Sequence, residues 1–334
     1  MLKTGINRFV LSMTLCFCSS FVYADTGKFD MDRWYAIQDN IKERALAENI
    51  SQSVIDATLQ KSAFIPAVVK NDKNQSEFKL TMQDYLARTV SSKRISSGKV
   101  MAKKYPTLLS KIEQTYGIPQ HVMLAFWGLE SNYGEVKSKY KLKNAFFSLM
   151  YDGRREKFFT NQLIALMKIA DKNNLDINSI HGSWAGAMGH FQFIPTTLEQ
   201  YGTDGNGDGS IDIINNVSDA MYSAGNYLGK LGWNKNEKIV RQVIIPSDFD
   251  TDLLKGDVKK NLSEWTRMGV TNPDGSPIPQ SDMIAGIVGD FANTDDNSPT
   301  MIAYLTYPNF YRIKKWNNSN WYAIAIALLS ESIK

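Results

Sequence analysis

The sequence predicts a mainly helical protein of the α+β class, in which a small β-containing segment interrupts a helical body. Apolar residues recur at intervals of three and four through most of residues 25–233. Between residues 234 and 305 this pattern gives way to short alternating runs, which indicate strands. Residues 306–334 return to a helical pattern. We therefore expect a large helical domain, a small mixed α/β insertion, and a C-terminal segment that rejoins the helical body.

The first 24 residues have the features of a secretory signal peptide. Lys3 and Arg8 form a basic start, an apolar stretch follows over residues 9–23, and Val22 and Ala24 are the small residues that precede cleavage. The apolar stretch is shorter than the roughly 20 residues that a membrane span requires. We therefore expect cleavage after Ala24 and an exported, periplasmic protein, soluble or peripherally attached, with no transmembrane segment.

Both cysteines, Cys16 and Cys18, lie inside this predicted signal. Leu15 and Phe17 precede them where a lipid anchor needs a small residue, which favours a soluble mature protein over a lipoprotein. A mature chain without cysteine has no disulfides and no thiolate metal sites. Removing residues 1–24 lowers the net charge from +4 to +2. This balance, without a Lys/Arg stripe among aromatic residues, argues against nucleic acid as a partner.

The helical body consists of amphipathic segments that are separated by polar, glycine or proline-containing breaks. We expect helices, in order, over residues 32–48, 51–60, 81–90, 97–114, 119–134, 154–172, 219–231 and 321–330. Within the insertion we expect strands over residues 239–245, 282–288 and 301–307, with a short helix over 261–268.

The helix expected over residues 119–134 carries the most informative residue of the chain. Pro119 suits a first turn and Gly134 a left-handed stop, and nearly everything between them is apolar. Such a helix is buried on all sides. Its one acid, Glu130, lies near the C-terminal end, one turn from Phe126 and Trp127.

Loss of solvation and the negative end of the helix dipole both raise the pKa of such an acid. A carboxyl group that stays protonated near neutral pH is what a glycosidase uses to protonate a leaving oxygen. The alternative is a structural glutamate bonded to nearby backbone or to an arginine, because structural networks also perturb pKa values.

A second unusual stretch covers residues 182–195. Gly182, Gly186 and Gly189 stand among bulky neighbours, which indicates a backbone that approaches something closely. Either a ligand or tight packing against a facing helix satisfies this pattern.

Residues 204–215 fit the opening of a calcium-binding loop, with oxygen donors at positions 1, 3 and 5 and a glycine at position 6. Odd positions of a tightly turning loop point toward the ion. Position 12 is Asn215 rather than a bidentate glutamate, and Asp219 is a substitute carboxylate. We expect a structural ion held weakly, with a dissociation constant of about 10⁻⁴ M. The alternative is a turn that holds nothing.

Four motifs, in their order and spacing, resemble the B-type lytic murein transglycosylases over roughly residues 76–329. They are residues 128–134 (GLESNYG), residues 182–195 with GSWAGAMG and QFIP, the calcium-type loop at 204–219, and Asn226-Tyr227. The resemblance implies a lysozyme-like helical catalytic domain with a small inserted β-containing domain. It also implies cleavage of the bond between N-acetylmuramic acid and N-acetylglucosamine in peptidoglycan. Glycan strands are therefore the expected partner, and cell-wall enzyme complexes are a further partner class that the resemblance suggests.

The resemblance also assigns roles to individual residues. Glu130 falls on the family's single catalytic acid. Family positions around the saccharide and the acid fall on Ser183, Gln192, Arg154, Arg155, Tyr227, Trp316, Asn317, Tyr322 and Tyr85. Calcium ligands fall on Asp204, Asn206, Asp208, Ser210 (through its carbonyl) and Asp219. Trp316 departs from the tyrosine that the family often has, and we expect it to serve as a stacking platform without a phenol to donate.

Most glycosidases use two carboxylates, but no second acid has the apolar setting of Glu130. Glu135 follows the helix stop, and Asp152 and Glu156 stand among Arg and Lys. One carboxylate suffices if the substrate supplies its own nucleophile, the muramoyl 6-hydroxyl, and closes a 1,6-anhydro ring. A hydrolytic muramidase and a non-catalytic peptidoglycan-binding protein are the alternatives. No organic cofactor is required, and calcium is the one ion that the motifs suggest.

Overall fold

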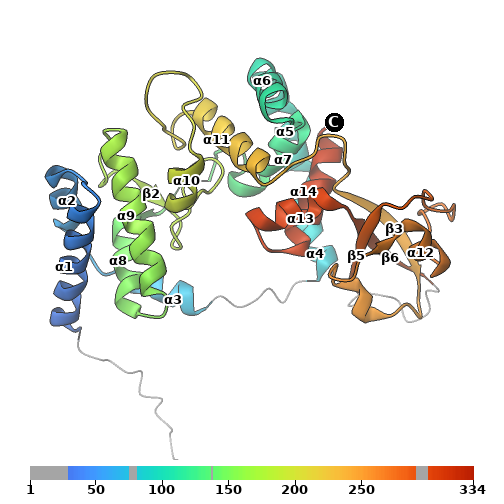
Figure 1. Cartoon of the computed structure of the whole chain (residues 1–334), viewed down its shortest axis with the longest axis horizontal. Helices are drawn as coiled ribbons and strands as arrows, with labels where there is room; N and C mark the ends of the chain where they lie inside the picture. The colour runs from blue at the N-terminus through green and yellow to red at the C-terminus, as the bar shows by residue number, and fades with distance from the viewer. Residues whose placement is uncertain (1–28, 75–80, 137, 291–299) are drawn as a thin grey trace, which may run out of the picture.

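The structure is a computed structural model that describes residues 29–74, 81–136, 138–290 and 300–334. The predicted signal peptide lies outside the described residues. Figure 1 shows a helical body with a small sheet at one end. The helices of the body are α1 (Met31–Ala47), α2 (Gln52–Leu59), α3 (Pro66–Lys73), α4 (Met82–Thr89), α5 (Ser92–Lys104), α6 (Pro106–Tyr116), α7 (Gln120–Ser131), α8 (Leu142–Asp152), α9 (Glu156–Lys172), α10 (Pro195–Tyr201), α11 (Val217–Lys230), α13 (Pro308–Trp316) and α14 (Asn320–Ile333).

Several of these helices begin at a polar residue whose side chain accepts a backbone N–H of the first turn. Asp30 accepts from Arg33 at 3.0 Å before α1, and Thr81 accepts from Asp84 at 3.1 Å before α4. These bonds satisfy donors that a helix end leaves without an intrahelical partner. The expected mainly helical fold is confirmed.

The small sheet has four antiparallel strands in the order β3-β6-β5-β4. Its strands are β3 (Val240–Pro246), β4 (Lys260–Asn261), β5 (Ile284–Gly289) and β6 (Thr300–Thr306), with η1 (Thr251–Leu254) and α12 (Leu262–Arg267) beside them. The three predicted strands are confirmed to within two residues. A separate hydrophobic cluster fills this part of the chain around Trp265, whose indole N–H donates to the carbonyl of Ala285 at 2.8 Å.

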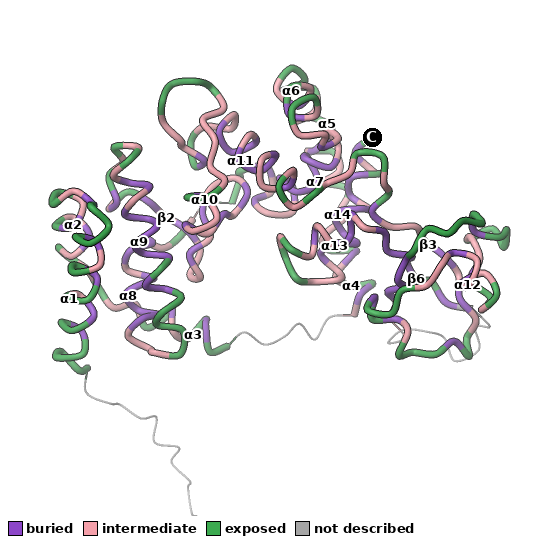
Figure 2. Tube along the Cα trace, viewed as in Figure 1, coloured by how far each residue is buried: buried purple, intermediate pink, exposed green. Residues whose placement is uncertain are grey.

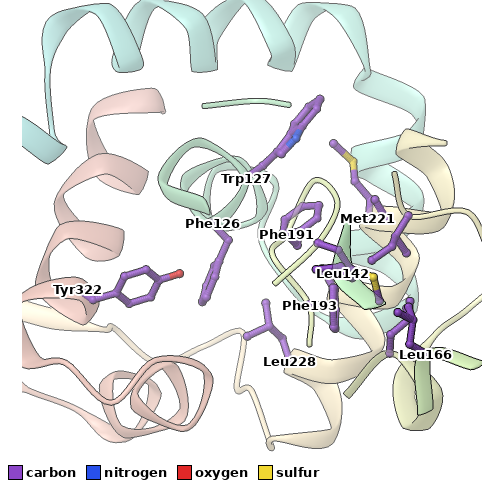
Figure 3. Packing of buried hydrophobic residues seen from close by; sticks show 14 of the residues in the cluster. Phe126, Trp127, Leu142, Leu166, Phe191, Phe193, Met221, Leu228 and Tyr322 are labelled. Carbon is purple, nitrogen blue, oxygen red and sulfur yellow. The ribbon is translucent and has the colours of Figure 1, made fainter. Parts of the chain in front are cut away.

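The large hydrophobic cluster lies in the helical body, with α7 at its centre (Figures 1 and 2). Phe126 and Trp127 are almost completely buried, and α14 packs against α7. Figure 3 shows Phe126, Trp127 and Phe191 in this cluster, with the hydroxyl of Tyr322 directed from α14 toward Phe126. The expected burial of this helix is confirmed, except that Glu130 lies at a partly open end.

The ends of α7 differ in detail from the expectation. Pro119 is the residue before the first turn, and the helix ends at Ser131 rather than continuing to Gly134. Asn132, Tyr133 and Gly134 all adopt left-handed backbone angles, with φ of 51°, 62° and 86°. The hydroxyl of Tyr133 donates to the carbonyl of Arg94 at 2.9 Å, which holds this turn against α5.

Proline also explains several of the places where the expected helices differ from the observed ones. Residues 97–114 form parts of two helices because Pro106 begins α6. Pro66 and Pro308 likewise occupy the first turns of α3 and α13, two helices that the sequence analysis did not name. A proline that suggests a break between helices in the sequence is here the first residue of a helix.

A small ribbon, β1 (Tyr140–Lys141) with β2 (His181–Gly182), joins the segment after α7 to the glycine-rich stretch. Among the helices of the described residues, none is long and apolar enough to cross a membrane.

Candidate active site

Glu130 lies in the last turn of α7, where one of its carboxylate oxygens receives two hydrogen bonds. The hydroxyl of Tyr322 donates to Oε1 at 2.5 Å, and the indole N–H of Trp316 donates to the same atom at 2.9 Å. Tyr322 lies in the first turn of α14, and Trp316 is the last residue of α13. The C-terminal segment of the chain thus supplies both contacts to an acid almost 200 residues earlier.

Burial raises the pKa of Glu130 from 4.5 to about 7, and the hydrogen bonds from Tyr322 and Trp316 act against that rise. The carboxyl group is therefore divided between its acid and its base form near neutral pH. Burial and the charge of Glu130 together raise the pKa of Tyr322 well above its usual value. Tyr322 consequently stays protonated and acts as a donor.

The second oxygen of Glu130, Oε2, accepts no hydrogen bond from the described residues, and it is not buried. An oxygen that is neither hydrogen-bonded nor buried is free to contact a substrate.

The other acids considered from the sequence have partners elsewhere. Glu135 accepts from Asn132, and Asp152 pairs with Lys73 and Arg154. Glu156 pairs with Arg33 at 3.0 Å, and none of these acids contributes to the raised pKa of Glu130.

Trp316 is packed among aromatic rings. Its ring centroid lies 5.0 Å from that of Tyr227, 5.1 Å from that of Phe126 and 5.4 Å from that of Phe193. The sequence predicts a stacking platform at Trp316, but it gives no direct sign that the indole donates to the acid. The signal that could have indicated this bond is the position of Trp316 six residues before Tyr322. Trp316 is the last residue of α13, a helix that was not predicted.

Two further tyrosines belong to this group. Tyr227 of α11 stacks on Tyr201 with ring centroids 4.7 Å apart and donates to the carbonyl of Lys315 at 3.4 Å. Tyr85 of α4 lies near the acid, since the charge of Glu130 contributes to its raised pKa, after the larger effect of burial. Trp316 and Tyr322 therefore contact Glu130 directly, Tyr85 lies near it, and Tyr227 packs against Trp316.

Ser183 and Gln192 are held by their own glycine-rich loop. The hydroxyl of Ser183 accepts the N–H of Ala187 at 3.0 Å, and the amide of Gln192 donates to the carbonyl of Gly189 at 2.9 Å. Gln192 adopts a left-handed backbone with φ of 49°. No hydrogen bond joins either side chain to Glu130 in the described part of the chain.

The glycines of this loop face protein atoms rather than an open space. A Cβ on Gly186 would lie 2.3 Å from the ring of Phe146, and one on Gly189 would lie 2.5 Å from the carbonyl of Ile213. Both glycines also have positive φ, of 95° and 71°. Tight packing accounts for them, which was one of the two alternatives.

Arg154 and Arg155 form a separate group at the turn between α8 and α9. Both guanidinium groups donate to the buried carboxylate of Asp72 in α3. Both arginine side chains are about half exposed, so their remaining donors face solvent. Sequence reasoning missed Asp72, because an acid in a short polar helix gives no sign of burial. Asn317 follows α13 as an exposed residue, and only its backbone makes a recorded contact.

The predicted calcium loop is wrapped around its first carboxylate. Asp204 accepts the N–H groups of Gly209 and Gly207 at 2.7 and 2.6 Å, and these amides hold the pKa of Asp204 below its usual value. Gly209, at position 6, has φ of 88°, as the tight turn requires. Buried Asp219 accepts the N–H groups of Gly205 and Asp212, both at 2.9 Å, and so joins the two ends of the loop.

The oxygen-only set of Asp204, Asn206, Asp208 and the carbonyl of Ser210 suits a hard cation in its chemistry. However, no three His, Cys, Asp or Glu side chains within the described ranges converge closely enough to hold a metal ion. The loop therefore has the backbone of a calcium site, whereas its carboxylates are bonded to backbone amides.

A carboxyl group whose pKa is raised toward neutrality by burial is the kind of general acid that lysozyme-like, glycan-cleaving enzymes use. The family model described as "Transglycosylase SLT domain" matches residues 33–331. The chain belongs to this family. The predicted family, fold class and enzyme class, a lytic transglycosylase acting on peptidoglycan, are thereby confirmed.

Individual relatives agree with this assignment. The chain is 28% identical to membrane-bound lytic murein transglycosylase B of Escherichia coli (strain K12) over 255 residues, which are 75% of this chain and 66% of that protein. It superposes on SltB3 of Pseudomonas aeruginosa, solved with NAG-anhNAM-pentapeptide, with a TM-score of 0.83 and 33% identity over 90% of this chain and 79% of SltB3. Slt35 of Escherichia coli, solved with calcium, shares the fold, with a TM-score of 0.76 and 23% identity over 89% of this chain and 92% of Slt35.

Proposed function

We propose that this protein cleaves the glycosidic bond between N-acetylmuramic acid and N-acetylglucosamine in peptidoglycan, leaves 1,6-anhydromuramoyl ends, and uses Glu130 as its single acid and base. The observation that carries the proposal is the setting of Glu130. Its pKa is about 7, Oε1 is held by Tyr322 and Trp316, and no second acid contributes to its electrostatics. The relative SltB3, solved with a ligand named as an anhydro-muropeptide, supports the choice of product.

In the first step, the proton on Glu130 moves to the glycosidic oxygen, and the bond from that oxygen to C1 of the muramoyl residue breaks. The electron pair of the bond leaves with the oxygen. The neighbouring 2-acetamido group stabilises the positive charge that develops at C1. General acid catalysis of this kind contributes about 10²–10⁴-fold to the rate.

In the second step, the Glu130 carboxylate takes the proton of the muramoyl 6-hydroxyl, whose oxygen bonds to C1 and closes the 1,6-anhydro ring. The acid is then restored and no water is consumed. Because the nucleophile belongs to the same sugar, the step has the effective-molarity advantage of an intramolecular reaction. Hydrolysis would instead require a water molecule at C1 and, in most glycosidases, a second carboxylate to activate it.

The test is mass spectrometry of the muropeptides released from purified peptidoglycan by the wild type, Glu130→Gln and Glu135→Gln. Glu135 is an exposed acid near the end of the same helix and serves as the matched control. We expect products one water lighter than hydrolysis products from the wild type and from Glu135→Gln, and none from Glu130→Gln. Ordinary reducing ends would make the protein a muramidase. Binding without any release would make it a peptidoglycan-binding protein.

We further propose that the residues around Glu130 contact the saccharide or the acid, as the family resemblance implies. Tyr85, Trp316, Tyr322 and Tyr227 have the better support, because the first three contact or lie near the acid and Tyr227 packs against Trp316. Arg154 and Arg155 present cationic groups at fixed positions on Asp72, which suits a carboxylate-bearing or polar strand. Ser183, Gln192 and Asn317 rest on the resemblance alone.

The remaining expectations also stay proposals. A structural calcium ion would bind at Asp204, Asn206, Asp208, the carbonyl of Ser210 and Asp219, without a part in the chemistry. The chain would be exported through a signal peptide over residues 1–24 and act in the periplasm on glycan strands, alone or within cell-wall enzyme complexes. The catalytic domain would comprise residues 25–233 and 306–334, with residues 234–305 as the insertion. The two hydrophobic clusters support this division.

A further inference from the structure

We propose that Trp316 is a positioning residue that confines the reactive proton of Glu130 to Oε2. Its indole N–H and the Tyr322 hydroxyl both donate to Oε1, at 2.9 and 2.5 Å. Two donors occupy the two lone pairs of that oxygen, so the proton of the neutral acid resides on the other one. The catalytic consequence rests on the proposed function, whereas the placement of the proton does not.

The restriction follows from the chemistry of the two donors. An indole N–H donates and cannot accept, whereas a phenol hydroxyl can rotate and accept. If the proton lay on Oε1, it would face the indole N–H, and a donor would oppose a donor. A tyrosine in place of Trp316 would not impose this restriction, because its hydroxyl could turn to accept the proton. The tryptophan therefore sets which oxygen acts.

The packing of the indole keeps its N–H directed at the acid. The ring is surrounded by those of Phe126, Phe193 and Tyr227, whose centroids lie 5.0–5.4 Å away. Phe126 belongs to the same helix as Glu130, so the helix that carries the acceptor also packs against the ring of the donor. These rings contact the indole at tilted or edge-on angles, and the N–H is the part of Trp316 that has a defined partner at the acid. The geometry therefore assigns the main role of Trp316 to its N–H.

Confinement to Oε2 matters because Oε2 is the free oxygen. The proton that leaves for the glycosidic oxygen then starts from the atom that can meet the substrate. The same atom, now bare, receives the proton of the 6-hydroxyl. A proton on Oε1 would have to move across the carboxyl group before it could be donated.

The test is a titration of the Glu130 carboxyl carbon by ¹³C NMR, on the whole protein without substrate, in the wild type and Trp316→Phe. A hydrogen bond to a carboxylate favours its charged form, so removing the indole N–H should raise the pKa of Glu130 by about one pH unit. The alkaline limb of the pH–activity profile should move upward by the same amount. The maximal rate should fall about tenfold, because the proton is no longer confined.

Trp233→Phe is the matched control. The indole nitrogen of Trp233 is buried, and it has no hydrogen-bond partner within the described part of the chain. The same substitution there removes no hydrogen bond, and we expect the titration of Glu130 to stay as in the wild type. If thermal denaturation shows that Trp316→Phe is unstable, Trp316→Met provides a second donor-free variant with a side chain that adapts to irregular space.

The outcomes are distinguishable. A slower Trp316→Phe enzyme whose Glu130 titrates as in the wild type would overturn the proposal and leave Trp316 a packing or stacking residue. A titration that shifts in Trp316→Phe and not in Trp233→Phe supports it. This support holds even if muropeptide analysis refutes the anhydro product, because the titration uses no substrate.

Discussion

The setting of Glu130 predicts that its neutralisation stabilises the protein while abolishing its activity. In the folded state, burial raises the pKa of Glu130 to about 7, compared with an ordinary value of 4.5. An unfolded chain restores the ordinary value. Above pH 7 the folded protein therefore holds a carboxylate that the unfolded chain solvates better, and this difference destabilises the fold. Glu130→Gln removes the charge and keeps an oxygen that can accept from Trp316 and Tyr322.

The magnitude follows from the two pKa values. Each pH unit between them corresponds to about 1.4 kcal/mol, so the full cost of the carboxylate is roughly 3 kcal/mol. Because Glu130 is partly open to solvent, we expect about 2 kcal/mol at pH 8. At pH 5, where the folded protein holds the neutral acid and the unfolded chain is only partly ionised, the cost falls below about 1 kcal/mol. The advantage of Glu130→Gln should thus grow as the pH rises from 5 to 8.

The assay is urea denaturation of the wild type and Glu130→Gln at pH 5 and pH 8, with the free energy of unfolding obtained at each pH. Glu43→Gln, at an exposed position of α1, controls for the loss of a surface carboxylate. A stabilisation by Glu130→Gln that is equal at both pH values, or larger at pH 5, would refute the reasoning. It would mean that burial does not raise the pKa of this acid.

Two further predictions concern structure away from the acid. Lys143 is buried, and its ammonium group donates to the carbonyls of Ala57 and Gln60, both at 2.7 Å. Lys143→Met should therefore lower the free energy of unfolding by about 2–4 kcal/mol. Urea denaturation measures this change, with the exposed Lys141→Met as the control. Calcium at about 10 mM, some 100 times the expected dissociation constant, should stabilise the protein by roughly 2–3 kcal/mol. Calorimetry should show a raised Tm with calcium and no comparable rise with magnesium. Calcium should not raise the Tm of Asp204→Ala. An equal rise in the Tm of that variant would contradict the assigned site.

The sequence was sufficient to predict the fold class and the buried setting of Glu130, because both depend on local patterns. The apolar run around Glu130 predicts a buried helix, and burial of one carboxyl group predicts its raised pKa. The strands of the insertion were likewise predictable from alternation. Proline was ambiguous, because the residue that ends one helix also begins another. Pro308 starts α13, and missing that helix hid the N–H that Trp316 directs at the acid.

Contacts between distant segments could not be predicted from sequence patterns. Asp72 and the pair Arg154 and Arg155 are about 80 residues apart, and nothing in a short polar helix indicates a buried carboxylate. The glycines of residues 182–189 correctly predicted that the backbone approaches other atoms closely, but not which atoms. At Gly186 and Gly189, where φ is positive, these atoms belong to the protein itself. Only the folded structure shows that Tyr322 and Trp316 donate to the same oxygen of Glu130.

A single carboxyl group can serve both halves of the proposed reaction only if it is neither too strong nor too weak an acid. Burial alone would keep Glu130 protonated and make it a reluctant acceptor of the 6-hydroxyl proton. Two hydrogen bonds alone would keep it ionised and leave no proton for the leaving oxygen. Together these opposing effects give a pKa of about 7, at which both forms are populated. The free energy of unfolding that Glu130→Gln is expected to recover is therefore the cost of holding one acid ready for both roles.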